Sequence, residues 1–216
     1  AWVDKDRLSS LSMPPADFPI ISAIKLPRMY AITPEWVSTI DELLHVLNQA
    51  IVGGARMVQI RIKSKISAVS KADIEAAVAS CQERQIIVLV NSDTYAVTDI
   101  VADGIQLTSA TLRLCSERPL PRDFWLGASC HSASDIDHAA SIGCDFVTLS
   151  PVLLTASHPN ALALGWEGLA RIAENSPLPI FALGGMNADL LTVARHCGAF
   201  GISGIREFCN LSLTPP

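Results

Sequence analysis

The chain has 216 residues, of which half are apolar and 17% are charged, and its formal net charge is −5. This length fits one large domain or two small ones, and the apolar content suits a sheet that is buried on both faces. The acidic balance argues against a nucleic-acid partner, and every apolar run is too short to span a membrane. The opening sequence AWVDKDRLSS is unlike a signal peptide. We therefore expect a cytoplasmic α/β protein that binds neither nucleic acid nor membranes.

The first part of the chain differs in pattern from the rest. Residues 1–13 are mixed in character, and Pro14 and Pro15 then favour a helix over 15–25, which Pro27 ends. Isoleucines at helical spacing give this segment one apolar face.

From Met29 onward, short apolar segments alternate with helical patterns. Eight segments are predicted as strands, at residues 29–33, 57–63, 86–91, 104–107, 124–129, 145–150, 179–183 and 200–203. Helices are predicted between them, at residues 35–52, 70–83, 94–102, from about 109, 133–142, 166–175 and 187–197.

Eight strand–helix repeats of one composition predict an α/β fold, a single (β/α)8 (TIM) barrel over 28–216, preceded by a short N-terminal helix. A Rossmann sheet is the alternative, but Thr33-Pro34-Glu35 stands where its glycine fingerprint would follow the first strand. Only REFCNLSLTPP follows the eighth strand, which is too short for a normal closing helix. We expect the helix over 15–25 to lie near that gap.

Barrels of this kind place their chemistry at the C-terminal ends of the strands. Gln59, Arg61 and Lys63 alternate along the second strand, so their side chains point the same way. Without acidic partners nearby, they favour an anion or a polar ring as ligand; solvated cations on a half-exposed strand are the alternative. Asn91, after the third strand, fits a helix cap or a binding site equally well.

The fifth strand ends in Ser129-Cys130-His131-Ser132, where Ser129 or His131 could bind a ligand or move protons and Ser132 fits the N-cap of the next helix. The loop after the sixth strand is long and carries Thr155 and His158, and long loops at this face often carry function.

Two adjacent glycines, Gly184-Gly185, follow the seventh strand, and Ile205-Arg206 follow the eighth. Paired glycines let backbone N–H groups approach an anion, so these two strand ends are predicted to bind phosphate. Two ordinary turns are the alternative. Six scattered cysteines without CxxC spacing are expected to be small buried side chains, not zinc ligands. Because no carboxylate pair stands at the strand ends, we expect no tightly held metal.

Seven segments in order, VQIRIK, LVNSD, ADGIQL, LGASCHS, DFVTLSPVLLTAS, PIFALGGM and GISGI, resemble thiamine phosphate synthase and its relative the thiazole tautomerase. The resemblance covers about 28–208 and implies a barrel that joins an aminopyrimidine diphosphate to a thiazole phosphate. It implies contacts with the pyrimidine and its pyrophosphate for Gln59, Arg61, Lys63, Asn91, Ser129 and Thr155. It implies a thiazole phosphate cradle at Gly184, Gly185, Ile205 and Arg206.

Five positions depart from the family pattern. Ser92 and Thr111 stand where the family has magnesium-binding acids, and Ser157 and His158 replace a threonine and a lysine of the long loop. The tautomerase histidine aligns with Pro151. Because magnesium and lysine neutralise a departing pyrophosphate, these changes imply a degenerate metal site, with magnesium needed only for residual synthase activity.

The first hypothesis is therefore a barrel that binds a phosphorylated pyrimidine or thiazole, with Lys63, Ser129 and His158 as the candidates for any catalysis. An active synthase and a non-catalytic scaffold are the alternatives. Residues 1–27 resemble the C-terminal end of a MutT-type Nudix hydrolase, with Asp17 at a position that helps recognise a purine in that family. This implies that the barrel is covalently fused to a preceding Nudix domain, through which the full-length protein would hydrolyse nucleotide diphosphates.

Overall fold

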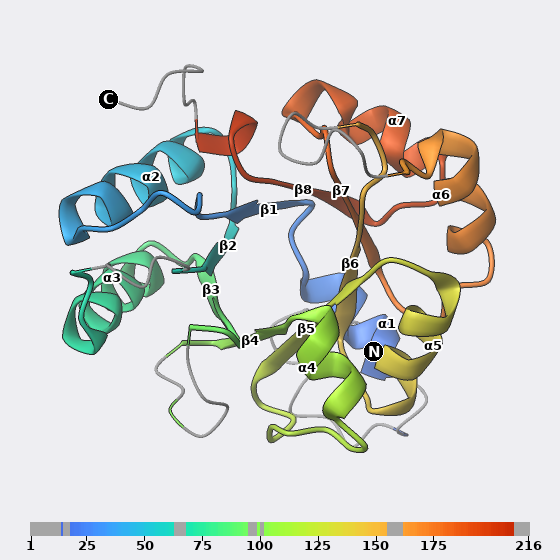
Figure 1. Ribbon diagram of the computed structural model, residues 1–216, viewed down its shortest axis with the longest axis horizontal. Coiled ribbons are helices and arrows are strands. Elements are labelled where there is room, and N and C mark those ends of the chain that lie inside the picture. The colour runs from blue at the N-terminus through green and yellow to red at the C-terminus, as the bar shows by residue number, and fades with distance from the viewer. Residues whose placement is uncertain are drawn as a thin grey trace, which may run out of the picture.

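Eight parallel strands form a closed barrel in this computed structural model, which describes residues 14, 18–62, 68–94, 99, 102–154 and 162–209. The strands pair in chain order, and β8 pairs with β1 to close the barrel, with helices around it (Figure 1). The strands are β1 (Met29–Ile32), β2 (Met57–Ile60), β3 (Ile87–Asn91), β4 (Gly104–Leu107), β5 (Trp125–Cys130), β6 (Phe146–Leu149), β7 (Ile180–Leu183) and β8 (Gly201–Gly204).

The α-helices are α1 (Phe18–Lys25), α2 (Ile40–Val52), α3 (Lys71–Glu83), α4 (Ser109–Leu114), α5 (Ala133–Ser141), α6 (Gly165–Ala173) and α7 (Leu191–His196). Two 3₁₀ helices, η3 (Ala188–Leu190) and η4 (Glu207–Cys209), follow β7 and β8. The predicted (β/α)8 barrel is thus confirmed, and an open Rossmann sheet is excluded. The helix predicted over 94–102 lies mostly outside the described residues.

Two predicted boundaries are corrected. The second helix begins at Ile40, not Glu35, because Thr39 caps it and exchanges hydrogen bonds with Glu42. The second strand ends at Ile60, and the N–H of Arg61 donates to Thr33 Oγ1 at 2.8 Å.

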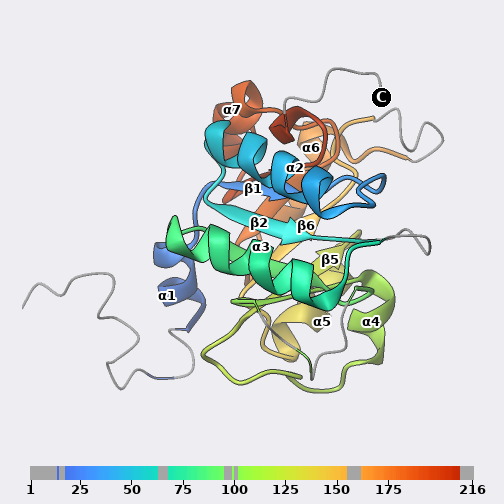
Figure 2. The ribbon, with the colours of Figure 1, turned by 90° about the vertical axis from the view of Figure 1, so that its left-hand side faces the viewer.

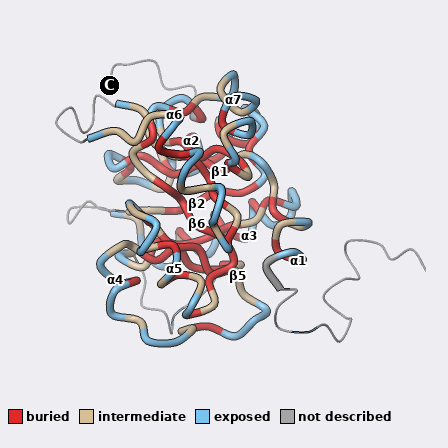
Figure 3. The backbone as a smooth tube through the Cα atoms, turned by 90° about the vertical axis from the view of Figure 1, so that its right-hand side faces the viewer, coloured by how far each residue is buried: buried red, intermediate tan, exposed pale blue. Residues whose placement is uncertain are grey.

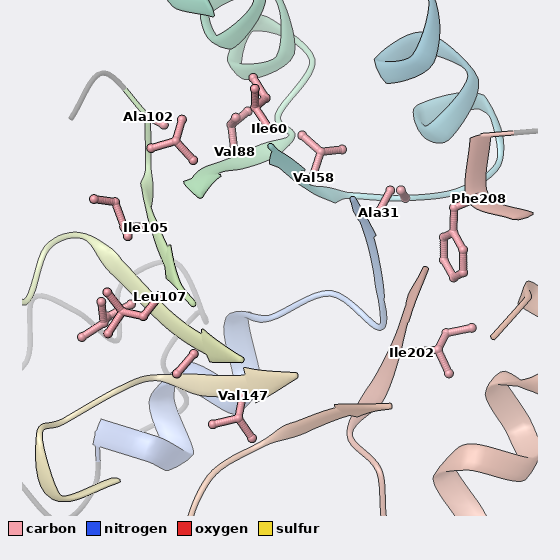
Figure 4. Packing of buried hydrophobic residues seen from close by; sticks show 14 of the residues in the cluster. Ala31, Val58, Ile60, Val88, Ala102, Ile105, Leu107, Val147, Ile202 and Phe208 are labelled. Carbon is pink, nitrogen blue, oxygen red and sulfur yellow. The ribbon is translucent and has the colours of Figure 1, made fainter. Parts of the chain in front are cut away.

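Buried residues are concentrated along the strands at the centre of the molecule (Figure 3), and they form two clusters. The larger cluster lies between the barrel and its helices, and Figure 4 labels members on β1, β2, β3, β4, β6 and β8. The smaller cluster fills the interior of the barrel with six side chains, Leu26, Tyr30, Met57, Leu89, Phe146 and Phe181. The rings of Tyr30, Phe146 and Phe181 meet edge to face, with centroids 5.4–5.7 Å apart, so the interior is an aromatic plug.

Helix α1 closes the end of the barrel at which the strands begin (Figure 2). It contacts β6, and Ser22 Oγ donates to Asp145 Oδ1 at 3.4 Å. The expectation that this helix lies at the gap after the eighth strand is therefore wrong. Helix η4 occupies that place: its Phe208 is buried and lies between Ala31 of β1 and Ile202 of β8 (Figure 4).

An ion pair holds the loops at the same end of the barrel. Arg118 Nη2 lies 2.9 Å from Asp145 Oδ2, and the side chains are only 9% and 11% exposed. Arg118 also donates to the carbonyl oxygens of Leu120, Gly143 and Phe124, while Asp145 accepts from the N–H of Leu126. The guanidinium therefore ties together the segments that precede β5 and β6. Among the described helices, none has the length and apolar character needed to cross a membrane.

Candidate ligand-binding site at the C-terminal end of the barrel

A polar layer follows the aromatic plug toward the C-terminal ends of the strands. Three members of this layer, Gln59, Asn91 and Thr148, each stand two positions after a residue of the smaller interior cluster on the same strand. Their side chains therefore face the same interior. Gln106 and Ser129 join them from β4 and β5. All except Ser129 are nearly inaccessible to solvent, and Ser129 is half-buried.

Hydrogen bonds connect this layer across the barrel. Gln106 Nε2 lies 3.2 Å from Ser129 Oγ and 3.4 Å from Thr148 Oγ1. The hydroxyl of Tyr30 lies 3.3 Å from both Gln59 Oε1 and Gln106 Oε1. Burial raises the pKa of the Tyr30 hydroxyl well above its usual value of 10.0, so the group keeps its proton and remains a donor. Side chains from five strands thereby form one network.

Arg61 is paired, in contrast to the sequence prediction. Its Nη1 lies 3.2 Å from Glu35 Oε1, and the two side chains are 21% and 58% exposed. The prediction failed because Glu35, which follows β1, is distant from Arg61 along the chain yet close to it across neighbouring strands. An anion at this strand end must share the guanidinium with a carboxylate.

The ends of β3 and β4 are joined by hydroxyl groups. Ser92 Oγ donates to Thr111 Oγ1 at 3.1 Å and accepts the N–H of Thr108 at 3.0 Å. The hydroxyls of Thr108 and Thr111 are 2.9 Å apart. Asn91 Oδ1 accepts the N–H of Asp93 at 2.9 Å, so this side chain stabilises the turn after β3. The side chain of Asp93 is exposed.

At the end of β5, His131 Nδ1 lies 2.8 Å from the carbonyl oxygen of Ser150. A carbonyl can only accept, so Nδ1 carries the proton and cannot take one from the Ser150 hydroxyl. Ser132 caps α5 as predicted, by accepting the N–H of Asp135. Burial raises the pKa of the Cys130 thiol to about 12, which keeps it protonated and unreactive. No activated nucleophile is formed by these residues.

The paired glycines after β7 adopt the backbone conformation that favours glycine. Gly184 and Gly185 have φ values of 99° and 68°. A Cβ on Gly184 would lie 3.0 Å from Pro151 Cα, and one on Gly185 would lie 2.8 Å from Leu153 Cβ. Only glycine lets this turn pack against the segment after β6. The turn is capped by Asn187, whose side chain accepts the N–H of Leu190.

The phosphate cradle expected after β8 has Ile205 half-buried and Arg206 exposed. Lys63, Thr155, Ser157 and His158 lie outside the described residues. Free thiols are found at Cys81, Cys115, Cys130, Cys144 and Cys197, and Cys81, Cys130 and Cys144 are buried as expected.

Sequence reasoning missed Tyr30, Gln106 and Thr148 as members of the polar network. Gln106 and Thr148 lie in the apolar segments GIQL and FVTL, where one polar residue at an inward position is the available signal. A separate cavity of about 580 Å³ lies at the opposite end of the barrel, beside Gln82, Asp103, Phe124 and Trp125. Asp103 there accepts from Gln82 and from the N–H of Val88, so it is already engaged within the fold.

These features define a (β/α)8 barrel with a polar interior at the end where proteins of this fold bind their ligands. Residues 29–208 match a family model described as "Thiamine monophosphate synthase" (TMP-TENI). The chain belongs to this family, and the resemblance of residues 28–208 to thiamine phosphate synthase is confirmed.

Named relatives agree with this assignment. The chain is 32% identical over 186 residues to "Putative thiamine-phosphate synthase 2" of Aquifex aeolicus, covering 86% of this chain and 99% of the relative. It is 27% identical over 167 residues to the thiamine-phosphate synthase of Thermosynechococcus vestitus, covering 77% of this chain but only 48% of that relative.

Solved structures show the same fold. Thiamine phosphate pyrophosphorylase from Pyrococcus furiosus superposes with a TM-score of 0.63 at 25% identity, covering 83% of this chain and 85% of that structure. The thiamine phosphate pyrophosphorylase of Bacteroides thetaiotaomicron superposes with a TM-score of 0.59 at 16% identity, covering 88% and 89%.

Proposed function

We propose that this barrel binds a phosphorylated pyrimidine or thiazole at the C-terminal ends of its strands, without a tightly held magnesium ion. The polar network offers amide and hydroxyl groups to a heterocycle. In this proposal, Gln59, Arg61, Lys63, Asn91, Ser129 and Thr155 contact the pyrimidine and its pyrophosphate. The backbone at Gly184, Gly185, Ile205 and Arg206 holds the other phosphate.

The hydrogen bonding of Ser92 and Thr111 carries the proposal. Magnesium takes near-octahedral oxygen ligands and is usually held by carboxylates. Here the two positions that match acids in the family hold hydroxyls that bond to each other, and Ser92 Oγ also accepts the N–H of Thr108. These residues do not fit a tightly held magnesium ion, and they add no negative charge to the site.

Membership of the thiamine monophosphate synthase family favours a second candidate, an active synthase that joins the two precursors. For that reaction, the departing pyrophosphate would need charge neutralisation from the remaining cations. Arg61 supplies part of this charge, but it shares it with Glu35.

Calorimetry with each precursor separates these candidates. The aminopyrimidine diphosphate and the thiazole phosphate are each titrated with and without magnesium chloride, and thiamine phosphate is assayed in a mixture of both. We expect at least one precursor to bind with an affinity that magnesium changes by less than about threefold, which corresponds to well under 1.4 kcal/mol. Magnesium-dependent formation of thiamine phosphate would favour the synthase. Absence of binding by both precursors would leave the barrel as a scaffold.

A gain-of-function variant tests the metal directly. We expect the double variant Ser92→Asp/Thr111→Asp to make binding of the diphosphate magnesium-dependent, because two carboxylates would then face one another. Ser134→Asp, which adds one of these two charges on α5 and away from Ser92 and Thr111, serves as the control and should leave binding independent of magnesium.

We also propose that residues 1–27 are the end of a preceding Nudix-type domain in a cytoplasmic fusion protein. The WVDKD and PPAD pattern and the helical Phe18–Lys25 support this proposal. Free thiols support a reducing compartment. Intact-mass measurement of the native protein provides the test: a mass far above 23.1 kDa with upstream peptides is expected, and a native mass near 23.1 kDa would overturn it.

A further inference from the structure

We propose that Gln106 is a positioning residue that makes the Ser129 hydroxyl a hydrogen-bond donor toward a bound ligand. The inference rests on the proposed function in one respect: the ligand must enter the polar end of the barrel. It adds a residue from β4 to the site and states which chemical group the ligand must present at Ser129.

Gln106 is held tightly inside the barrel. It is fully buried, and its neighbour in register on β5 is Gly127. A Cβ at Gly127 would clash with Gln106 Oε1 and with the ring of Phe146, so the glycine makes room for the amide. The amide of Gln106 therefore lies between the aromatic plug and Ser129.

The direction of the hydrogen bonds follows from the amide. Gln106 Nε2 has two protons and no lone pair, so the hydroxyls of Ser129 and Thr148 must both accept from it. Each hydroxyl then has its own proton to donate elsewhere. Thr148 is buried, but Ser129 is half-buried at the polar end, so its proton is directed to that space.

Tyr30 holds the amide in this orientation. Its hydroxyl donates toward Gln106 Oε1, which places the nitrogen on the side of Ser129. The same hydroxyl lies 3.3 Å from Gln59 Oε1, so the two glutamines that frame the interior share one donor. The geometry thus selects a ligand with a hydrogen-bond acceptor at Ser129, such as an unprotonated ring nitrogen or a phosphoryl oxygen.

The first experiment needs no ligand. In protein labelled with ¹⁵N-glutamine, the side-chain NH₂ signal of Gln106 is identified as the one missing from Gln106→Glu or Gln106→Met. Ser129→Ala should shift this signal, because it removes an acceptor. Ser203→Ala should not, because Ser203 Oγ donates to the carbonyl of Tyr30 and not to Gln106. An unshifted signal in Ser129→Ala would overturn the proposal.

The second experiment is a double-mutant cycle with the aminopyrimidine diphosphate as probe. A carboxylate in Gln106→Glu would accept the hydrogen bond of the Ser129 hydroxyl and so turn it away from the ligand, and Gln106→Met would leave Ser129 without its partner. We expect each variant to lower affinity at least about tenfold in the wild-type background and less than about twofold in the Ser129→Ala background. Equal losses in both backgrounds would mean that Gln106 acts only on the fold.

The two proposals can fail separately. If wild-type protein binds neither the aminopyrimidine diphosphate nor the thiazole phosphate, the proposed function fails, and the Gln106 amide signal alone decides the positioning role. If the probe binds and the losses are additive, the proposed function stands and the positioning role is wrong. Circular dichroism of each variant distinguishes either outcome from unfolding.

Discussion

At the scale of single residues, the pair formed by Arg61 and Glu35 sets how much positive charge the end of β2 offers to an anion. The carboxylate is 58% exposed and the guanidinium is 21% exposed. Exposed ion pairs contribute only about 0–1 kcal/mol, so the pair weakens the attraction of Arg61 for phosphate without abolishing it. In the proposed anion site, Glu35 would therefore lower the affinity for an anion.

Replacing this glutamate should strengthen anion binding. We expect Glu35→Gln to raise the affinity for inorganic pyrophosphate by up to about fivefold at low salt, which is the effect of losing an interaction of about 1 kcal/mol. Calorimetry at two salt concentrations measures it, since screening should reduce the gain. Glu75→Gln removes a similar exposed pair with Lys71 on α3 and is the control. An unchanged or weaker affinity in Glu35→Gln would contradict the role.

The candidate site was only partly predictable at this scale. Gln59 and Arg61 were singled out because side chains alternate along strands, and Ser129 because it stands near the end of a strand. The partners of these residues were missed because they come from distant parts of the chain. Tyr30 and Gln106, for example, are 76 positions apart and meet only once the barrel closes.

At the scale of elements, short local sequence patterns mark where two of the helices begin. The sequence Thr39-x-x-Glu42 is a capping box, and Ser70-x-x-Asp73 forms a second one at α3. The capping box at Thr39 and Glu42 places the start of α2 at Ile40. The packing of Phe208 after β8 was not predicted, because a single aromatic residue carries no periodic pattern.

The capping box of α2 predicts a dependence of stability on pH. The backbone N–H of Ser38 and further bonds from Ser38 and Thr39 lower the pKa of Glu42 below 4.5. A carboxylate with a lowered pKa in the fold stabilises above the unfolded value, and the stabilisation disappears as pH falls through the folded value. Glu42→Gln should lower the free energy of unfolding at pH 7 and reduce its acid dependence below pH 4.5. Urea unfolding at several pH values measures both.

Two further variants test whether the capping box stabilises α2. Thr39→Ala should cost about 0.5–2 kcal/mol, because it removes the reciprocal half of the same cap. Glu83→Gln, at the exposed C-terminal end of α3, is the control and should cost less. If Glu42→Gln and Glu83→Gln behave alike at every pH, the capping box does not stabilise α2.

At the scale of the whole molecule, Arg118 and Asp145 join parts of the chain that no single element connects. Their contact brings together the segments before β5 and β6, and Ser22 attaches α1 to the same carboxylate. Ser22 and Asp145 are 123 positions apart, which explains why the place of α1 was predicted incorrectly. The repeat pattern predicted the barrel; it had no information on which strand a helix outside the repeat would contact.

Breaking this ion pair should destabilise the whole barrel. We expect Arg118→Met to lower the free energy of unfolding by about 3–5 kcal/mol, because Asp145 would remain buried without its charged partner. Arg118→Met/Asp145→Asn should recover part of the loss. Arg113→Met, which removes a 64% exposed arginine, is the control and should cost less than about 1 kcal/mol. Equal urea unfolding midpoints for Arg118→Met and Arg113→Met would contradict a stabilising role for the ion pair between Arg118 and Asp145.

Ionisation of the buried hydroxyl of Tyr30 provides an optical signal for the unfolding of the barrel at alkaline pH. Burial holds the pKa of this group well above 10.0, so unfolded chains ionise first, and stability falls as pH rises above that value. The chain has only two tyrosines. We expect the ultraviolet absorbance of tyrosinate from Tyr30 to appear together with loss of the fold, and to be missing in Tyr30→Phe. Two coincident transitions in wild-type protein would report the opening of the barrel without any added label.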